Sequence, residues 1–326
     1  MAVASQRGRL IASFIAIYLI WGSTYLGIRF AIETIPPFTL SATRFGLAGL
    51  IMLGIAAFRG ETEVTGAQFR SAAIVGCLLM LANSLVGVAE KRIPSGIAAL
   101  LVAMTPVFMV LLEWARPGGR RPTWLVSLGL AIGLAGVATL VGPASFAGSD
   151  GGMDLIGAGT VLAGCLAWSA GSIYSRHAPG PTSGFMTAAI QMLAGGAFVA
   201  LLGVVRGELT TFDIGAISMR SFLAWAYLLV FGSLIAFTAF VYLLRVSTPA
   251  RVATYAYVNP VVAVLLGWTF GGESISGRML VAAAIIVGGV AIITAAEGRA
   301  PQEPKLPKEP PATYGDVDEM RLEESA

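Results

Sequence analysis

The sequence predicts an all-α membrane protein with ten transmembrane helices arranged as two inverted five-helix repeats. Three observations support this prediction: the composition, the spacing of long apolar runs, and similar segments in the two halves. Of 326 residues, 56% are hydrophobic and 12% are charged, with a mean hydropathy of +0.80. Soluble proteins carry about a quarter charged residues, and a soluble domain of this length could not bury so much apolar surface. The charges cluster between long uncharged runs, as they do in bilayer-embedded chains.

Apolar runs long enough to cross a bilayer recur along the chain. A transmembrane helix needs about 20 mostly apolar residues. The third and fourth runs are separated by only a few residues around Lys91, which predicts a tight hairpin. The first run follows two arginines but is long and lacks a small-x-small cleavage site, so we interpret it as a retained helix. The ten predicted spans are residues 9–29, 38–58, 70–89, 95–114, 123–142, 153–175, 183–205, 220–243, 250–270 and 277–296.

Similar segments recur in the same order in the two halves of the chain. Residues 132–137 (IGLAGV) resemble 285–290 (IIVGGV), Pro106-Val107 matches Pro260-Val261, and the WGSTY segment beginning at Trp21 echoes WSAGSIY beginning at Trp168. Apolar, Gly-rich helices can match by chance, but three matches in one order favour duplication. Because each half has five helices, an odd number, the second half must enter the membrane from the opposite side, as in many secondary transporters.

These repeats divide the chain into three parts. We expect residues 1–147 to form the first five-helix repeat and 148–297 the second. Residues 298–326 are rich in Pro and acidic residues with little apolar periodicity, which predicts a disordered tail. Lys and Arg are more numerous in the loops that share the side of the N-terminus, so both termini are expected to be cytoplasmic.

Two prolines lie at matching places inside the fourth and ninth predicted helices. Pro106 and Pro260 each remove a backbone hydrogen bond and crowd the preceding turn. A pair of interrupted helices in corresponding halves indicates a midplane binding site and hinges. The alternative is that membrane helices simply tolerate proline.

Arg44 is a charged residue inside the second predicted helix, roughly 9 Å along its axis at about 1.5 Å per residue. A guanidinium facing lipid at the centre would cost about 2.5 to 3.5 kcal/mol. Two interpretations are open: the side chain faces the helix bundle, or it extends to the outer headgroups. Glu33, in the preceding loop, is a candidate partner.

Aromatic and polar residues form stripes on the first and ninth predicted helices. Trp21 and Tyr25 lie on one face of the first, and Tyr255 and Asn259 on one face of the ninth. With Trp168, such residues suit a cavity that stacks planar groups and offers a few polar anchors. The alternative is the interfacial aromatic belt.

Two polar residues share a face of the third predicted helix. Asn83 lies mid-helix, where the bilayer penalises an amide that lacks a hydrogen bond. Glu90 lies seven residues later, near the outer boundary. It either titrates as a proton-coupling group or pairs with Lys91 or Arg92.

The remaining motifs point to packing, and some kinds of chemistry are excluded. Glycines in the fifth and tenth helices (Gly129, Gly133, Gly136, Gly288 and Gly289) allow close packing between the halves or between two protomers of a homodimer. The chain has no phosphate-binding loop and no HExxH or GxSxG motif. We therefore predict no catalytic residues, no metal and no cofactor. Without an aromatic-interleaved basic face, the pI near 9.0 does not indicate nucleic-acid binding.

The chain resembles the drug/metabolite transporter superfamily, specifically its EamA-type ten-helix exporters. The resemblance rests on residues 20–25 (IWGSTY), Arg44-Phe45, 94–106 (PSGIAALLVAMTP), 249–260 (PARVATYAYVNP) and Gly272-Glu273. It implies an inverted five-plus-five fold, a central cavity and export of metabolites or drugs across the inner membrane. The family's Gly-Glu after the fourth helix is missing here, so Glu273 is expected only to cap a helix.

These observations predict a secondary transporter that exports small metabolites, amino acids or drugs across the inner membrane by alternating access. Its partners are a small-molecule substrate and the lipid bilayer. The alternative is a membrane-embedded enzyme acting on lipid or isoprenoid substrates, for which the sequence offers no catalytic constellation.

Overall fold

The computed structural model describes residues 2–119, 121–142, 154–247 and 254–299. Throughout these residues the chain is helical and contains no strand. The helices of the first half are α1 (Ala2–Ala31), α2 (Pro37–Phe58), α3 (Gly66–Glu90), α4 (Ser95–Val102), α5 (Thr105–Ala115) and α6 (Trp124–Val141). Those of the second half are α8 (Leu155–His177), α9 (Gly184–Val205), α10 (Glu208–Thr211), the 3₁₀ turn η1 (Ile214–Ala216), α11 (Met219–Tyr227), the π-helix η2 (Leu228–Ile235), α12 (Ala236–Val246), α14 (Tyr255–Phe270) and α15 (Gly277–Arg299).

The apolar helices match the predicted spans. Within the described part of the chain, nine helices are long and apolar enough to cross a membrane, and a shorter apolar segment, Val258–Phe270, lies in the ninth predicted span. The first residues of that span, 250–253, lie outside the described residues. The fourth span consists of α4 and α5, and the eighth of α11, η2 and α12. The predicted hairpin is confirmed, since only four residues separate α3 from α4.

The second half of the chain enters the bundle from the opposite side to the first. The guanidinium of Arg29, at the end of α1, donates to the backbone carbonyl of Glu90, at the end of α3. Asp154, which precedes α8, bonds to Arg92 just after α3 at 2.9 Å. Helix α8 therefore begins on the side where α1 ends, which we name the Glu90 side. The predicted fold of two inverted five-helix repeats is confirmed, whereas the exact repeat boundaries stay predictions.

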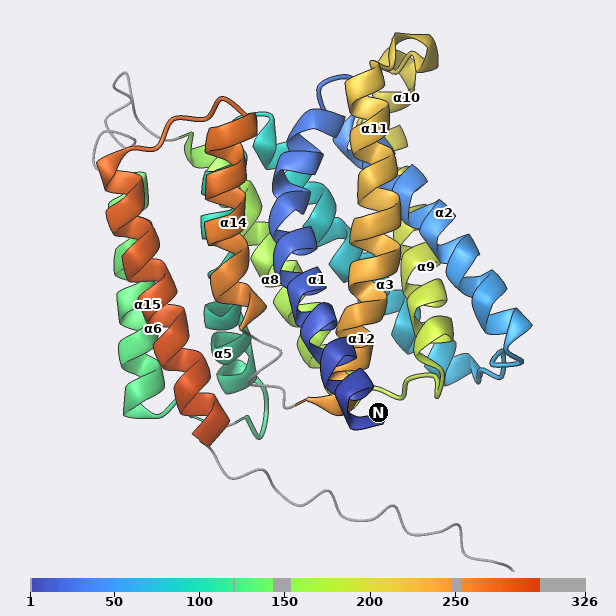
Figure 1. Cartoon of the computed structure of the whole chain (residues 1–326), viewed down its shortest axis with the longest axis horizontal. Coiled ribbons are helices and arrows are strands. Elements are labelled where there is room, and N and C mark those ends of the chain that lie inside the picture. Colours follow the sequence, from blue (N-terminus) through green and yellow to red (C-terminus); the bar gives the residue numbers. More distant parts are fainter. Residues whose placement is uncertain (1, 120, 143–153, 248–253, 300–326) are drawn as a thin grey trace, which may run out of the picture.

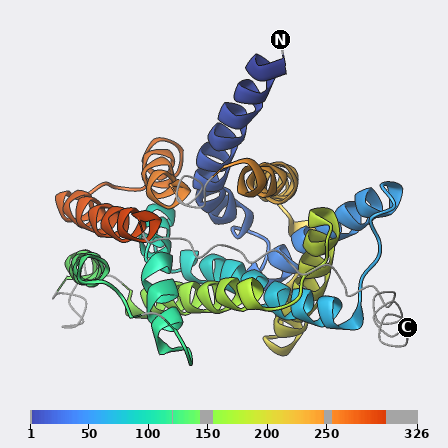
Figure 2. The same cartoon turned by 90° about the horizontal axis from the view of Figure 1, so that it is seen from below.

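The two halves pack against each other through symmetry-related helices. The most extensive helix contacts are those of α2 with α9 and of α6 with α15; in Figure 1, α6 and α15 lie together at one end of the bundle and α2 and α9 at the other. Seen from below, α1 and the α11–α12 span lie on one side of the bundle, opposite α3 and α8 (Figure 2). Each pair takes one helix from each half, so the halves interlock along the whole bundle.

Glycines of the fifth and tenth spans are used within the chain. A Cβ atom at Gly129 would lie 2.8 Å from the Gly289 carbonyl oxygen, and one at Gly136 would lie 2.6 Å from the Ile286 side chain. Side chains there would force α6 and α15 apart. These glycines therefore pack the halves together, and the alternative role in a homodimer stays a prediction.

Glutamates from the second half cap two helices of the first. Helices α2 and α4 follow Pro36 and Pro94, which offer no side-chain cap. The Glu208 carboxylate accepts from the backbone N–H groups of Phe38 and Thr39 at 3.1 and 2.8 Å. The cap on α4 comes from Glu273, whose oxygens accept from the Ser95 N–H and hydroxyl, both at 2.7 Å, and from the Gly96 N–H at 3.0 Å. The expectation that Glu273 caps a helix is confirmed.

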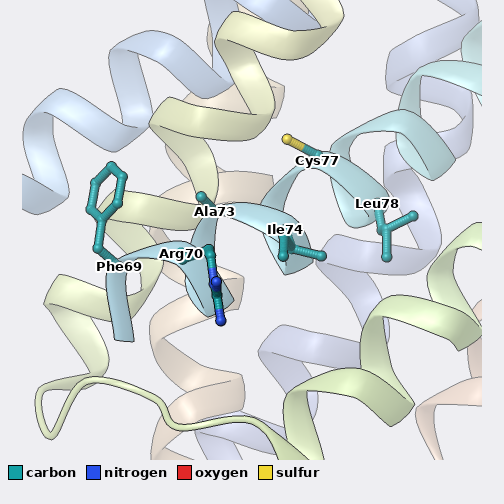
Figure 3. A pocket seen from close by; sticks show the side chains of 6 residues that line it. All are labelled: Phe69, Arg70, Ala73, Ile74, Cys77 and Leu78. Atoms are coloured by element: carbon teal, nitrogen blue, oxygen red, sulfur yellow. The ribbon is translucent and has the colours of Figure 1, made fainter. Parts of the chain in front are cut away.

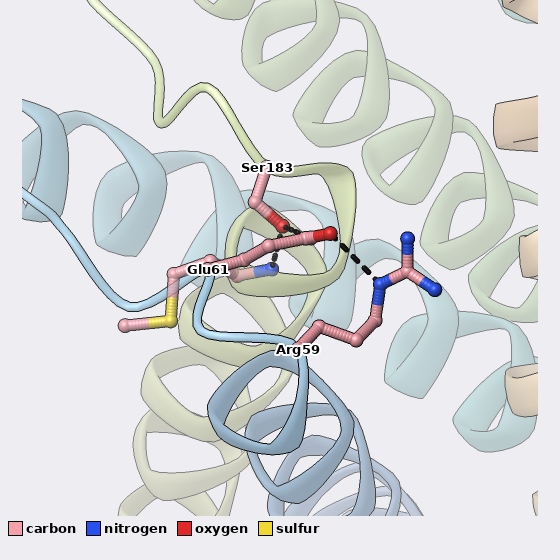
Figure 4. A network of polar contacts seen from close by, with 4 residues as sticks. Arg59, Glu61 and Ser183 are labelled. Atoms are coloured by element: carbon pink, nitrogen blue, oxygen red, sulfur yellow. Dashed lines mark hydrogen bonds and ion pairs between the residues drawn. The ribbon is translucent and has the colours of Figure 1, made fainter.

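A matching contact runs in the other direction on the opposite side of the bundle. Glu61, after α2, accepts from the hydroxyl of Ser183 at 2.5 Å and pairs with Arg59 at 2.8 Å (Figure 4). Ser183 in turn caps α9, because its hydroxyl accepts from the Met186 N–H. Each half thus sends a loop glutamate to the helix start of the other half.

Candidate functional site

The fourth span is broken at Ala103 and Met104, just before Pro106. Helix α4 ends at Val102, and α5 begins at Thr105 with Pro106 in its first turn. Proline has no N–H, so the Val102 carbonyl would lose its helical partner; the Thr105 hydroxyl donates to it instead, at 2.6 Å. From α8, the Ser169 hydroxyl donates to the Thr105 carbonyl at 3.1 Å. Two side-chain hydroxyls, of Thr105 and Ser169, thus satisfy backbone carbonyls at the break.

Its counterpart Pro260 lies within α14, which continues through it to Phe270. The neighbouring Asn259 is 7% exposed. With its amide oriented to satisfy its hydrogen bonds, the amide nitrogen donates to the carbonyls of Tyr255 and Tyr18, both at 3.2 Å. Asn259 thus joins α14 to α1. The two prolines occupy matching spans in different local structures, and their role as hinges stays a prediction.

A π-helix interrupts the eighth span next to these elements. Residues Leu228–Ile235 form η2, with α-helix on both sides. Single π-turns are rare and are frequently found at functional sites, because they turn carbonyls and side chains out of the α-helical register. Here η2 presents the Gly232 carbonyl to the indole N–H of Trp21 at 3.4 Å and the Ser233 hydroxyl to Arg44 at 2.8 Å.

Arg44 is buried inside the bundle. Its side chain is 4% exposed, so of the two predicted orientations the structure adopts the one facing the bundle. The Nε donates to Ser233, Nη1 donates to the Asn83 oxygen at 3.4 Å, and the guanidinium lies 4.6 Å from the ring centre of Phe45. The prediction that Glu33 pairs with Arg44 is wrong, because Glu33 pairs with Arg220 at 3.1 Å.

Aromatic rings from both halves gather beside η2. Trp21 contacts Phe240 and Tyr255, with ring centres 5.1 and 5.2 Å apart, and Phe240 and Tyr255 are 6.1 Å apart. The edge-on geometry of Tyr255 against both rings is typical of favourable aromatic pairs. We name these three residues the aromatic cluster. It joins α1 to α12 and α14.

The structure brings together most of the residues predicted for the cavity. Tyr25 is one turn from Trp21 and lies within electrostatic reach of Tyr255 and Glu90. Trp168 differs from the others. It is half-buried on α8, and among the described residues no ring contact or hydrogen bond joins it to the aromatic cluster. The role of each of these residues in a cavity stays a prediction.

Glu90 is fully buried at the end of α3, and neither carboxylate oxygen has a hydrogen-bond partner in the described structure. The proposed pairing with Arg92 is wrong, because Arg92 bonds to Asp154. The nearby charges are Arg29, whose guanidinium binds the Glu90 backbone carbonyl, and Glu273. Glu90 is thus a buried acid with one cation, Arg29, and a second acid, Glu273, nearby.

The surface grooves lie away from these residues. One, of about 480 Å³, runs along α3 and is lined by Phe69, Arg70, Ala73, Ile74, Cys77 and Leu78 (Figure 3). Another, of about 290 Å³, lies between α5 and α8 near His177. Neither contains a residue predicted for the cavity. With exposed fractions of 4% and 0%, Arg44 and Glu90 are closed off from solvent in this conformation.

Sequence reasoning missed η2 and its two functional groups, the Gly232 carbonyl and the Ser233 hydroxyl. The segment LLVFGSLI is uniformly apolar apart from one serine, so nothing in its pattern distinguishes a π-helix from an α-helix. The cap from Glu208 was also missed. Its signal was indirect: a helix that starts after Pro36 without a Ser, Thr, Asp or Asn cap needs an acceptor from elsewhere.

Comparisons with known proteins agree with this architecture. The EamA-like transporter family model matches residues 9–142 and 155–295. The uncharacterized inner membrane transporter YedA of Escherichia coli (strain K12) is 39% identical over 297 residues, covering 90% of this chain and 94% of its own. The probable terminal-alkyne amino-acid exporter of Streptantibioticus cattleyicolor is 26% identical over 84% of this chain and 89% of its own.

A solved crystal structure is similar over 90% of this chain and 99% of its own, with a TM-score of 0.59 and 25% identity. The family match covers both halves, and the described helices are apolar and long enough to cross a bilayer. The predicted family resemblance and transport function are confirmed. The chain belongs to the EamA-like transporter family and is a multi-pass transporter of the inner membrane.

Proposed function

We propose that this transporter exports a small organic solute by alternating access, through rocking of residues 1–147 against residues 148–297. The observation that carries the proposal is the pair of contacts with η2 of the second half made by Arg44, which is buried, and by Trp21, which is partly buried, both from the first half. Transporters of inverted repeats bind substrate where the repeats meet, near interrupted helices. We also propose that both termini are cytoplasmic, which the distribution of Lys and Arg supports.

Metabolites, amino acids and drugs are the proposed substrate classes, and the protein acts without catalysing a reaction. The relatives support this: one is named as an amino-acid exporter and others as transporters. The alternative, an enzyme acting on lipid or isoprenoid substrates, gains no support from them. The aromatic cluster suits a solute with an apolar or planar part.

Glu90 is the proposed coupling residue, exchanging a proton for the solute. A partnerless carboxyl group is far less costly to bury neutral than charged. We infer that Glu90 holds a proton in the closed conformation and releases it to water when the bundle opens. Arg29 and Tyr25 face it from α1 and Glu273 from the segment after α14, while Lys91 and Arg92 follow it in the chain. Movement of any of these elements would change its charge environment.

Transport is tested by flux in proteoliposomes, with amino acids, aromatic compounds and cationic drugs under imposed ion gradients. We expect protein-dependent flux of at least one class. We expect Trp21→Ala to reduce that flux about tenfold or more, since it removes a partly buried aromatic contact between the halves. Trp124→Ala is the matched control, because Trp124 is 74% exposed at the start of α6. Absence of flux for every class, or equal loss in both variants, would contradict the proposal.

A further inference from the structure

Arg44 is a buried cation without a buried anion. The ion pairs of the described residues join Arg59 to Glu61, Arg92 to Asp154, Arg116 to Glu113 and Arg220 to Glu33. Arg44, at 4% exposure, contacts only the neutral groups of Ser233 and Asn83 and the ring of Phe45. Charged groups inside a membrane protein are normally paired, and when they are not they mark substrate or ion paths. The missing counter-charge therefore has to come from outside the described chain.

The guanidinium has donors left to bind such an anion. Arginine carries five N–H groups, of which one on Nε and one on Nη1 are used. The remaining three lie on Nη1 and Nη2. These two nitrogens form an edge that can hold a carboxylate through two parallel hydrogen bonds. Because Ser233 fixes Nε and Phe45 lies beside the guanidinium, that edge is held in one orientation.

The backbone of the π-helix passes close to this edge at a glycine, Gly232. A Cβ atom at Gly232 would lie 3.2 Å from Arg44 Nη2 and 3.2 Å from the Thr24 methyl group. Any larger residue would cover Nη2. The Gly232 carbonyl accepts from the Trp21 indole, and Ser233 accepts from Arg44, so Trp21 of the aromatic cluster and Arg44 contact adjacent residues of η2.

We propose that Arg44 binds the carboxylate of the transported solute, a monoanionic or zwitterionic organic acid with an apolar body that contacts Trp21, Phe240 and Tyr255. This inference rests on the proposed transport function and names its substrate class. A single guanidinium matches one carboxylate, whereas a multiply charged phosphate ester would need further cations. Burial makes the pair selective, because an amide in place of the carboxylate would leave the charge of Arg44 uncompensated.

Matched pairs of probes test the carboxylate directly. The proteinogenic L-amino acids and their α-amides, together with phenylpropionate and phenylpropionamide, are compared by thermal stabilisation of the purified full-length protein. We expect at least one acid to stabilise the wild type while its amide does not. In Arg44→Gln that affinity should fall about 30-fold or more, as for loss of one partner of a buried charge pair. Arg44→Lys keeps the charge but loses the two-bond edge, so it should retain part of the affinity.

The control is Arg70→Gln, which removes an exposed arginine from α3. Equal stabilisation by acids and amides, no stabilisation by any acid, or an acid response that survives in Arg44→Gln would each overturn the proposal. Should Arg44→Gln fail to fold, Arg44→Lys and Gly232→Ala provide the same comparison with the charge retained. Flux of amines or amides without flux of acids would leave the transport function standing and remove the carboxylate.

Discussion

Arg44 and Glu90 are both buried in the bundle, and they differ in how the protein surrounds them. Arg44 is held by Ser233, Asn83 and Phe45 in one orientation. The Glu90 carboxylate has no hydrogen-bond partner in the described structure. A fixed cation with donors to spare suits binding of an anion, whereas an acid without partners suits gaining and losing a proton. Burial alone thus does not define a role; the surrounding hydrogen bonds separate substrate binding from coupling.

The residues between Arg44 and Glu90 explain how substrate binding at Arg44 could affect proton binding at Glu90. Asn83 bonds to Arg44 and lies two turns before Glu90 on the same helix. Tyr25 of α1 lies within electrostatic reach of Glu90, and Trp21, one turn away, bonds to η2 beside Arg44. Helices α1 and α3 therefore both run from one charge to the other. A shift of either helix would move both sites together, as coupling requires.

Replacement of Glu90 by Gln should have the largest effect of these substitutions, on proton-driven accumulation of solute. Glutamine keeps the shape but cannot exchange a proton. For one proton per solute, a gradient of one pH unit supports about tenfold accumulation, since one unit equals about 1.4 kcal/mol. We expect Glu90→Gln to abolish that accumulation while keeping downhill exchange. Loss of both, or of neither, in proteoliposomes would contradict a coupling role.

Gly232→Ala should weaken substrate binding at Arg44 without removing the charge of Arg44. The added methyl group would lie 3.2 Å from Nη2, so either the guanidinium or η2 must shift. Overpacking of this kind costs about 1 to 3 kcal/mol. Where that cost falls on the orientation of Arg44 that binds substrate, it corresponds to roughly 5- to 150-fold weaker binding. Gly54→Ala on α2, where nothing lies within 4 Å, is the matched control. Equal substrate affinity in the two variants would show that Arg44 Nη2, the atom nearest to the added methyl group, takes no part in substrate binding.

Hydropathy was sufficient to predict the spans, and the odd number of spans in each half was sufficient to predict their inversion, because both follow from the apolar pattern of single segments. The site depends on contacts between segments. Arg44 and Asn83 were separate candidates in the sequence, and their hydrogen bond exists only because α2 and α3 pack with one rotation. Glu33 lies closer in sequence to Arg44 than Ser233 does, yet it pairs with Arg220 because the end of α1 meets α11. Proximity in the sequence therefore predicted the wrong partner for Arg44, because tertiary packing determines which side chains meet.

The two capping glutamates give a paired test of the Glu90 surroundings. Glu208→Gln and Glu273→Gln each replace a charged acceptor at a helix N-terminus, so each should cost about 1 kcal/mol of stability. Only Glu273 lies near Glu90. We therefore expect similar shifts in melting temperature from the two variants, and a changed pH dependence of solute accumulation from Glu273→Gln alone. The same change of pH dependence in Glu208→Gln would indicate that rigidity of the helix starts, rather than charge near Glu90, controls coupling.

Asp154→Asn should have the smallest effect and separates two sources of pH dependence on the Glu90 side. The Gly157 N–H first, and Arg92 second, hold the pKa of Asp154 below its usual value. An acid whose folded pKa is depressed stabilises the protein above its unfolded pKa, about 3.9, and loses that contribution as the pH falls through the folded pKa. The melting temperatures of wild type and Asp154→Asn should therefore differ slightly at pH 7, and the difference should shrink as the pH falls below the unfolded pKa of about 3.9. Between pH 5.5 and 8 Asp154 keeps its charge, so the variant should retain the pH dependence of transport that Glu90→Gln abolishes. If Asp154→Asn also abolished it, the hairpin around Arg92, and not the buried carboxyl group, would be the part of the molecule that responds to protons.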